Sequence, residues 1–198
     1  MTALFVTLYS YAVAERLGEL FLSRRNRRRM HELGFEQRER ASSLGIMVAL
    51  HVAWLLCTPL EAMFLPAPLP AGVPIVAAVV FSLTQLLRLW TLCTLGTHWN
   101  VSVMTAGKTS HGFVSNGPYR FMRHPNYLVV ILEIATLPLV GSALYSCIVF
   151  SLLNAIILVS RIRVEERHLA NIPGYAQAMS EKPRFIPLVF RRARPHAT

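Results

Sequence analysis

The sequence predicts an all-α integral membrane protein with about five transmembrane helices, a C-terminal helical hairpin and a cytoplasmic C-terminal helix. Of its 198 residues, 54% are hydrophobic and only 15% are charged, whereas soluble domains carry about 25% charged residues. The mean hydropathy is +0.43. Basic residues alternate with long apolar runs, which is the charge distribution typical of multi-pass membrane proteins.

The N-terminal half contains three predicted spans. They cover Ala3–Leu22, Leu44–Leu65 and Ala71–Leu95. Glu15, Arg16 and Glu19 make the first span amphipathic, so these charges should face protein or lipid headgroups. An Arg-rich hydrophilic loop is expected between the first two spans, from Ser23 to Ser43, and the second span is expected to kink or end near Pro59.

The C-terminal half predicts a polar segment and then a hairpin. The polar segment runs from Gly96 to His124, and two apolar arms of about 16 residues follow between Tyr127 and Ser160, joined at Gly141-Ser142. Such arms are slightly shorter than the ~20 residues of a full span, so short spans and a re-entrant hairpin both remain possible. The tail from Arg161 should begin as a helix that leaves the membrane.

The basic residues also predict the orientation. Of the 20 Lys and Arg residues, 18 lie in the 23–43 loop, the 96–124 segment or the tail after residue 160. By the positive-inside rule these parts face the cytoplasm, with the N-terminus outside. The net charge of +10 predicts contacts with membrane lipids and no nucleic-acid partner, because the basic runs are short and border the spans.

Two polar clusters bracket the hairpin, at 117–127 and 161–166. Ionisable groups at a membrane boundary usually serve function. Asn126 and Glu133 share one helical face, and Asn154, Arg161 and Glu165 form a stripe on the second arm. We expect the two stripes to face each other or a common cavity open to the cytoplasm.

The start of the first arm predicts an anion site. Pro125 suits the first turn of a helix, His124 or a neighbour would cap it, and the N–H groups of that turn can bind an anion. Structural roles are the alternative: Glu133 could pair with Arg88 or Arg161, and Arg161 with Glu165.

Four motifs follow one another in a fixed order. They are Leu95-Gly96-x-x-Trp99, Gly117-Pro118-Tyr119-Arg120, Arg123-His124-Pro125-x-Tyr127 and Arg161-x-x-x-Glu165-Glu166. This set resembles the isoprenylcysteine carboxyl methyltransferase family over roughly residues 95–175. The resemblance divides the chain into N-terminal membrane helices, 1–95, and a catalytic region, 96–198.

Features of the N-terminal half resemble a bacterial branch that O-methylates long-chain alkylresorcinols and alkylpyrones. They are Arg16-Leu17-x-Glu19-Leu20, Ser23-x-Arg25-Asn26 and Leu50-His51-x-x-Trp54-Leu55. The acceptor would then be either a prenylcysteine-type carboxylate or an alkylresorcinol or alkylpyrone hydroxyl. Both are lipophilic small molecules or prenylated substrates. The sequence carries no indication of oligomeric state.

The resemblance implies S-adenosyl-L-methionine (SAM) as the methyl donor. It places the cofactor contacts on His111, Gly112, Phe113, Val114, Tyr119, His124, Pro125, Asn126, Tyr127 and Glu165. Arg161 would lie against the substrate, with Asn154 on the same helical stripe. Glu133 or His124 is a candidate base, if the acceptor must lose a proton. Met104 stands where a relative has a polar cofactor contact, so that role is not carried over.

Other functions are weighed against this one. A membrane reductase of the sterol-reductase kind would bind NADPH and not respond to SAM, and a non-catalytic lipid-binding subunit would tolerate loss of Glu165 and His124. His51, on an apolar span, is expected to be a helix-contact residue rather than a metal ligand. No His or Cys pair has zinc-site spacing, so no metal is expected.

Overall fold

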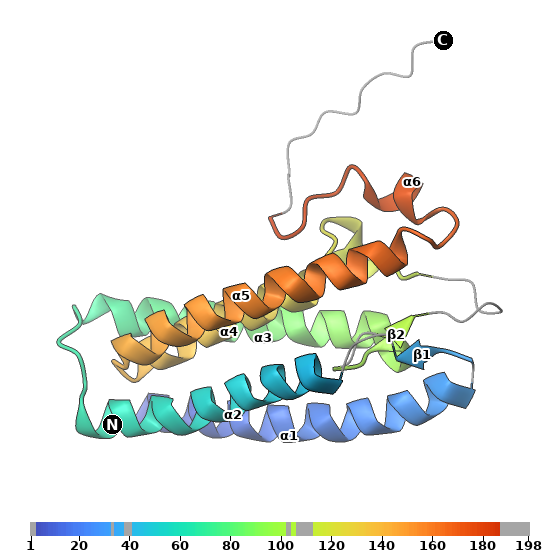
Figure 1. The fold of residues 1–198 in the computed structure, drawn as a ribbon. Helices are drawn as coiled ribbons and strands as arrows, with labels where there is room; N and C mark the ends of the chain where they lie inside the picture. Colours follow the sequence, from blue (N-terminus) through green and yellow to red (C-terminus); the bar gives the residue numbers. More distant parts are fainter. Residues whose placement is uncertain (1–2, 33, 38–40, 102–103, 106–112, 187–198) are drawn as a thin grey trace, which may run out of the picture.

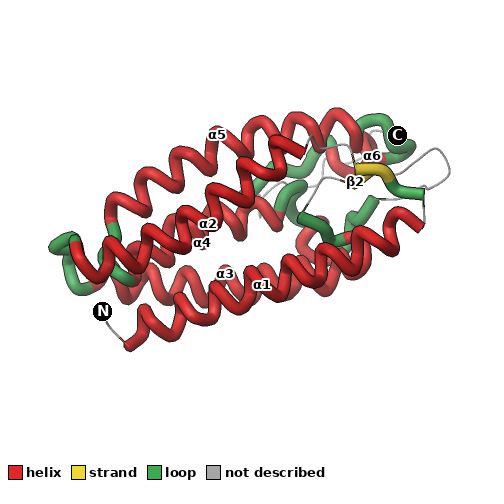
Figure 2. The backbone as a smooth tube through the Cα atoms, turned by 60° about the horizontal axis from the view of Figure 1, so that its bottom comes forward, coloured by secondary structure: helices red, strands yellow, loops and turns green. Residues whose placement is uncertain are grey.

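The fold is a bundle of five long helices. The computed structural model describes residues 3–32, 34–37, 41–101, 104–105 and 113–186. The long helices are α1 (Ala3–Glu32), α2 (Ala41–Phe64), α3 (Gly72–Leu95), α4 (Pro125–Val140) and α5 (Leu144–Leu169). They run along one common direction, and the short elements gather at one end (Figures 1 and 2).

The short elements complete that end of the bundle. They are the 3-10 helices η1 (Gly96–His98) and η2 (Gly117–Arg120), the helix α6 (Tyr175–Met179), and the strands β1 (Glu36–Gln37) and β2 (Met104–Thr105). The two strands pair antiparallel. The sequence did not predict this small ladder, because two residues are too few to show a period.

The all-helical membrane class is confirmed. Within the described residues, three helices are long and apolar enough to cross a membrane: Ser43–Phe64, Gly72–His98 and Leu144–Leu169. The first arm of the hairpin, α4, is a shorter apolar helix. The count of five spans and the cytoplasmic side of the C-terminal helix stay predictions.

The expected loop after the first span is wrong for residues 23–32. Helix α1 continues without a break to Glu32. Ser23, Asn26 and Met30 recur on one face of this extension and are buried, while Arg24, Arg25, Arg28 and Arg29 are exposed on the other. Arg is a good helix former, and the buried stripe gives the basic stretch a reason to remain helical.

Helix α2 does not end at Pro59 but continues to Phe64. A proline inside a helix leaves the carbonyl four residues earlier without its N–H donor. Here that carbonyl belongs to Leu55, and the hydroxyl of Tyr9 on α1 donates to it at 2.6 Å. This bond satisfies a polar group that is expensive to leave unpaired in an apolar environment, and it also ties α1 to α2.

A buried charge cluster joins α1, α3 and α4. The guanidinium of Arg88 donates from Nε to Glu133 Oε1 at 2.8 Å and also pairs with Glu19. Arg16 bridges Glu19 and Glu133, and Gln85 donates to Glu133 Oε1 at 2.9 Å. Arg88 and Glu133 are each 1% exposed, so each depends on the others for compensation.

We expect Arg88→Gln to destabilise the protein strongly. The change leaves the carboxylates of Glu19 and Glu133 undercompensated in the bundle interior, which typically costs about 3–5 kcal/mol. Thermal unfolding in detergent or nanodiscs measures it, with Arg25→Gln on the exposed face of α1 as the matched control, expected within about 0.5 kcal/mol of wild type. Equal melting temperatures for the two variants would contradict a stabilising role for the cluster.

Candidate active site

A cavity of about 570 Å³ lies among the five long helices and the short elements, and Arg16, Glu19 and Arg88 of the charge cluster are among its lining residues. At one end polar and aromatic side chains line it. They are His98, Asn100, Phe113, Tyr119, Arg123, His124, Asn126, Tyr127, Glu165 and Tyr175. Apolar side chains of α1 and α2 line the other end. They are Val13, Leu17, Leu20, Val48, Val52 and Leu55.

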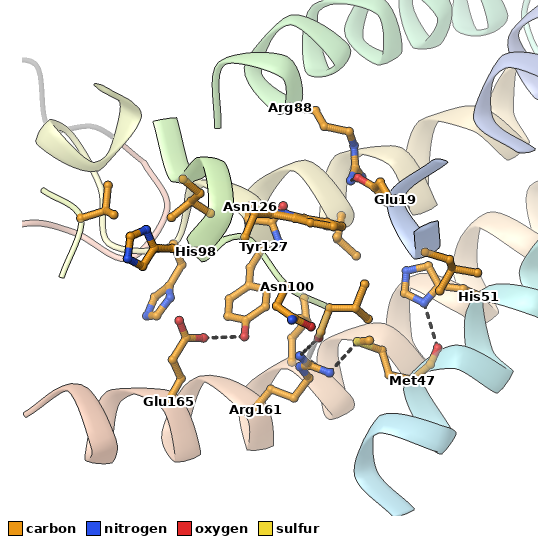
Figure 3. Close-up of a pocket in the computed structure, with 18 of the residues that line it drawn as sticks. Glu19, Met47, His51, Arg88, His98, Asn100, Asn126, Tyr127, Arg161 and Glu165 are labelled. Carbon is orange, nitrogen blue, oxygen red and sulfur yellow. Dashed lines mark hydrogen bonds and ion pairs between the residues drawn. The ribbon is translucent and has the colours of Figure 1, made fainter. Parts of the chain in front are cut away.

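The polar end is built where α4 meets α5. The hydroxyl of Tyr127 donates to Glu165 Oε2 at 2.5 Å, as Figure 3 shows. The imidazole of His124 stacks on the Tyr127 ring, with centroids 5.4 Å apart. Asn126 lies beside them on α4, and its Oδ1 is buried without a hydrogen-bond partner. Such an atom needs a ligand or water to satisfy it.

His124 precedes the first residue of α4 without capping it through its side chain. Pro125 takes the first helical position, as the sequence predicted. His124 Nε2 lies 3.1 Å from Glu166 Oε1, and an ionised carboxylate only accepts hydrogen bonds, so this ring nitrogen carries the proton.

Aromatic residues from three segments wall the polar end. Gly117 adopts φ +53°, and a Cβ there would lie 2.3 Å from Thr94 Oγ1, so only glycine allows η2 to approach α3 this closely. This approach brings Tyr119 to the cavity. Burial, reinforced by the charge of Glu165, raises the pKa of Tyr119 and raises that of Tyr175 to about 12. The rings of Phe113 and Tyr175 meet edge to face at 5.3 Å.

Arg161 lies between the polar and apolar ends. The residue is 4% exposed, and its guanidinium donates to the carbonyl of Val101 and to the sulfur of Met47, each at 2.7 Å. The segment carrying Val101 is held in turn by α1: Asn26 donates to the carbonyl of Trp99 at 2.8 Å, and the Ser23 hydroxyl accepts from Val101 N at 3.1 Å. The extended α1 therefore positions Arg161.

A C-terminal strap, residues 182–185, crosses the polar end. The amides of Arg123 and His124 donate to the carbonyls of Pro183 and Arg184 at 2.9 and 3.0 Å. Arg184 also pairs with Glu166 at 2.7 Å. Glu166 thus connects the strap to the helix that carries Glu165 and holds His124 at the same time.

Most of the predicted site residues lie on this one cavity. Those lining it are Phe113, Val114, Tyr119, His124, Asn126, Tyr127, Asn154, Arg161 and Glu165. His111 and Gly112 lie outside the described residues. Pro125 is buried at the start of α4. Glu133 is not among the lining residues and belongs to the charge cluster, which agrees with the structural alternative for it and provides no route to an acceptor proton.

Several lining residues were not predicted from the sequence as site residues. They are Met47, His51, His98, Trp99 and Asn100. Trp99 belongs to the first of the four family motifs, which is a sequence signal for it. Asn100 follows an apolar span without any periodic pattern, so only the fold brings it to the cavity. His51 stands out as the one imidazole within a predicted apolar span. That isolation was available as an indication of function.

Comparison with known proteins decides the family. The sequence profile described as "Isoprenylcysteine carboxyl methyltransferase (ICMT) family" matches residues 75–171. The chain belongs to the ICMT family. The matched residues include η2, α4 and the whole of α5, and therefore most of the polar end of the cavity.

The chain is also similar to two curated proteins and to one solved structure. The uncharacterized protein YpbQ of Bacillus subtilis (strain 168) is 32% identical over 167 residues, 84% of this chain and 96% of YpbQ. The cobalt-zinc-cadmium resistance protein CzcN of Cupriavidus metallidurans (strain CH34) is 32% identical over 97 residues, 48% of this chain and 44% of CzcN.

The solved structure is that of the eukaryotic intramembrane Ras methyltransferase ICMT. It superposes with a TM-score of 0.57 at 21% identity, over 72% of this chain and 52% of that protein. At this identity the likeness concerns the fold, and this ICMT-family chain spans about half the length of the solved enzyme. The branch that methylates alkylresorcinols is untested by these comparisons and stays a prediction.

We expect Glu166→Ala to loosen the strap. The carboxylate of Glu166 pairs with Arg184, Arg123 and His124. The strap carbonyls accept hydrogen bonds from the amides of Arg123 and His124, which protects these two amides from hydrogen exchange. Because Arg184 is half-exposed, its pairing is screened, and we expect exchange of the Arg123 and His124 amides to accelerate about tenfold, equivalent to ~1.4 kcal/mol. Hydrogen exchange by mass spectrometry measures this, with Glu32→Ala as control. Unchanged exchange would show that the strap holds without Glu166.

Proposed function

We propose that the protein is a SAM-dependent integral membrane O-methyltransferase that acts on a lipophilic acceptor. The observation that supports this most directly is the cavity: most of its polar end lies in the region matched by the ICMT profile, and its apolar end is lined by side chains of α1 and α2. A water-soluble donor and a greasy acceptor can thus meet in one space. The active site would face the cytoplasm of a bacterial inner membrane, following the charge distribution.

The residues at the polar end fit SAM. Glu165 offers a carboxylate for the ammonium group, and the backbone N–H groups of the first turn of α4 offer donors for the carboxylate group. Tyr119 and Phe113 offer aromatic faces for the adenine, and the unpaired Oδ1 of Asn126 is an acceptor for a ribose hydroxyl or an amine. The cavity volume is within the ~300–1,000 Å³ usual for ligand sites.

When bound, SAM would supply an electrophilic methyl group on a positively charged sulfur. The chain's own part is to bind, align and exclude water. Tyr127 orients Glu165 through their hydrogen bond, and α6 contributes Tyr175 and Met179 to the cavity wall. Alignment and desolvation of this kind lower a barrier by up to about 7–11 kcal/mol.

Arg161 is the proposed acceptor-binding residue. Its guanidinium is fixed by Val101 and Met47, and it stands where the apolar end begins, with Asn154 on the same face of α5. A buried guanidinium stabilises an anionic or acidic oxygen, and the apolar walls of α1 and α2 would hold the tail. Both acceptor classes inferred from the sequence have this design, an acidic oxygen on a long apolar chain.

The proposed function is tested by lipid mass spectrometry of cells with and without the gene. We expect a lipid that is one methyl group heavier only when the gene is present. The purified protein in nanodiscs should transfer labelled methyl from SAM to that lipid. Tight NADPH binding and reduction of a lipid double bond, with no methyl transfer, would contradict the proposal.

We expect Glu165→Gln and Tyr127→Phe to weaken donor binding. Glu165→Gln removes the charge that pairs with the ammonium group, so we expect the Kd for SAM to rise about 10- to 100-fold, or roughly 1.5–3 kcal/mol. Tyr127→Phe keeps the charge of Glu165 and removes the hydroxyl that orients it, so we expect about a fivefold rise, near 1 kcal/mol. Calorimetric titration with SAM measures both, with the exposed Glu32→Gln as control. Unchanged affinity in Glu165→Gln would remove Glu165 from the donor site.

A further inference from the structure

His51 is an unassigned imidazole on the cavity. It lies on α2, one turn after Met47, whose sulfur accepts a hydrogen bond from the Arg161 guanidinium. Figure 3 places His51 on the far side of Arg161 from Glu165. The side chain is therefore at the acceptor end of the site and away from the groups proposed to bind the donor.

The geometry of His51 fixes its tautomer. Nδ1 lies 2.9 Å from the carbonyl oxygen of Met47. A carbonyl only accepts hydrogen bonds, so Nδ1 carries the hydrogen and Nε2 of the neutral ring keeps its lone pair. An imidazole held in one tautomer by a backbone carbonyl has the arrangement that a general base requires.

The other basic groups on the cavity are already engaged. His124 carries a proton on Nε2 toward Glu166, Glu19 accepts from Arg16 and Arg88, and Glu165 accepts from Tyr127. The remaining imidazole among the described lining residues, His98, is exposed and packs edge to face on Phe35.

We propose that His51 is the general base of the transfer and that the acceptor is a neutral hydroxyl rather than a carboxylate. This inference rests on the proposed methyltransferase function. As the acceptor oxygen bonds to the methyl carbon, its O–H bond breaks and the proton passes to His51 Nε2. The methyl–sulfur bond breaks and its electron pair stays on sulfur. A carboxylate acceptor, already ionised, would need no such base.

The surroundings of His51 determine how its activity depends on pH. Arg16 of α1, Arg88 of α3 and Glu133 of α4 interact with it electrostatically, and Arg161 of α5 lines the same cavity. Protonation of the ring removes the Nε2 lone pair, so methylation of a hydroxyl should fall as pH decreases through the ionisation of His51. In a variant without the imidazole, the rate should no longer follow the ionisation of His51. It should instead increase with pH as the acceptor hydroxyl itself ionises.

The test compares two acceptors in nanodiscs with SAM. The hydroxyl acceptor is a long-chain alkylresorcinol and the carboxylate acceptor is N-acetyl-S-farnesylcysteine. For His51→Gln we expect kcat on the resorcinol to fall about 100-fold at neutral pH with KM nearly unchanged, and any turnover of the carboxylate to stay within twofold of wild type. A ring-fluorinated resorcinol, whose hydroxyl is more acidic, should recover most of the loss. Added imidazole should partly rescue His51→Ala. The exposed His31→Gln is the matched control.

The turnover of the two acceptors distinguishes failure of the His51 role from failure of the methyltransferase function. Equal losses on both acceptors, or no loss on the resorcinol, would overturn the role of His51 and leave the methyltransferase intact. Wild-type turnover of the carboxylate alone would overturn the hydroxyl assignment. If wild type binds SAM but methylates neither acceptor or the lipid extract, the proposed function itself fails and this inference fails with it.

Discussion

The buried charge cluster of Arg16, Glu19, Arg88 and Glu133 is the constraint on which the rest of the bundle depends. Inside an apolar bundle each charge must find its counter-charge, because an uncompensated one costs several kcal/mol. Three helices contribute, so satisfying the cluster fixes how α1 sits along α3 and α4. A slip of α1 by one turn would separate the partners. The alignment of α1 then determines where its cavity-lining residues lie. It also places Ser23 and Asn26, which bind the segment that carries Val101.

The consequence is a cavity with two chemical ends. Toward the short elements, α4, α5 and η2 supply carboxylate, imidazole, amide and phenol groups. Toward the middle of the bundle, α1 and α2 supply aliphatic side chains. Arg161 stands at the junction, fixed by a carbonyl from the segment that α1 holds. In the proposed function, the membrane would supply the acceptor, and the polar end would face the compartment that contains the donor.

Neighbouring carboxylates on α5 have different tasks. Successive helical residues point about 100° apart, so Glu165 faces the cavity and Tyr127, whereas Glu166 faces His124, Arg123 and the strap. One carboxylate lines the cavity, and the other organises the wall around it. The assignment to the ICMT family is consistent with this division, since the profile covers both residues.

The sequence by itself determined the membrane class, the hairpin and the polar stripes of α4 and α5, because apolar length, charge placement and a 3.6-residue period are local properties. Only the tertiary structure decided that residues 23–32 remain helical, that Pro59 is tolerated and that Glu133 pairs with Arg88. Ser23 and Asn26 bind residues more than 70 positions away, and the carbonyl left by Pro59 is satisfied by Tyr9. The place of His51 on the cavity likewise depends on how α2 meets α5, a long-range packing relation that no local pattern encodes.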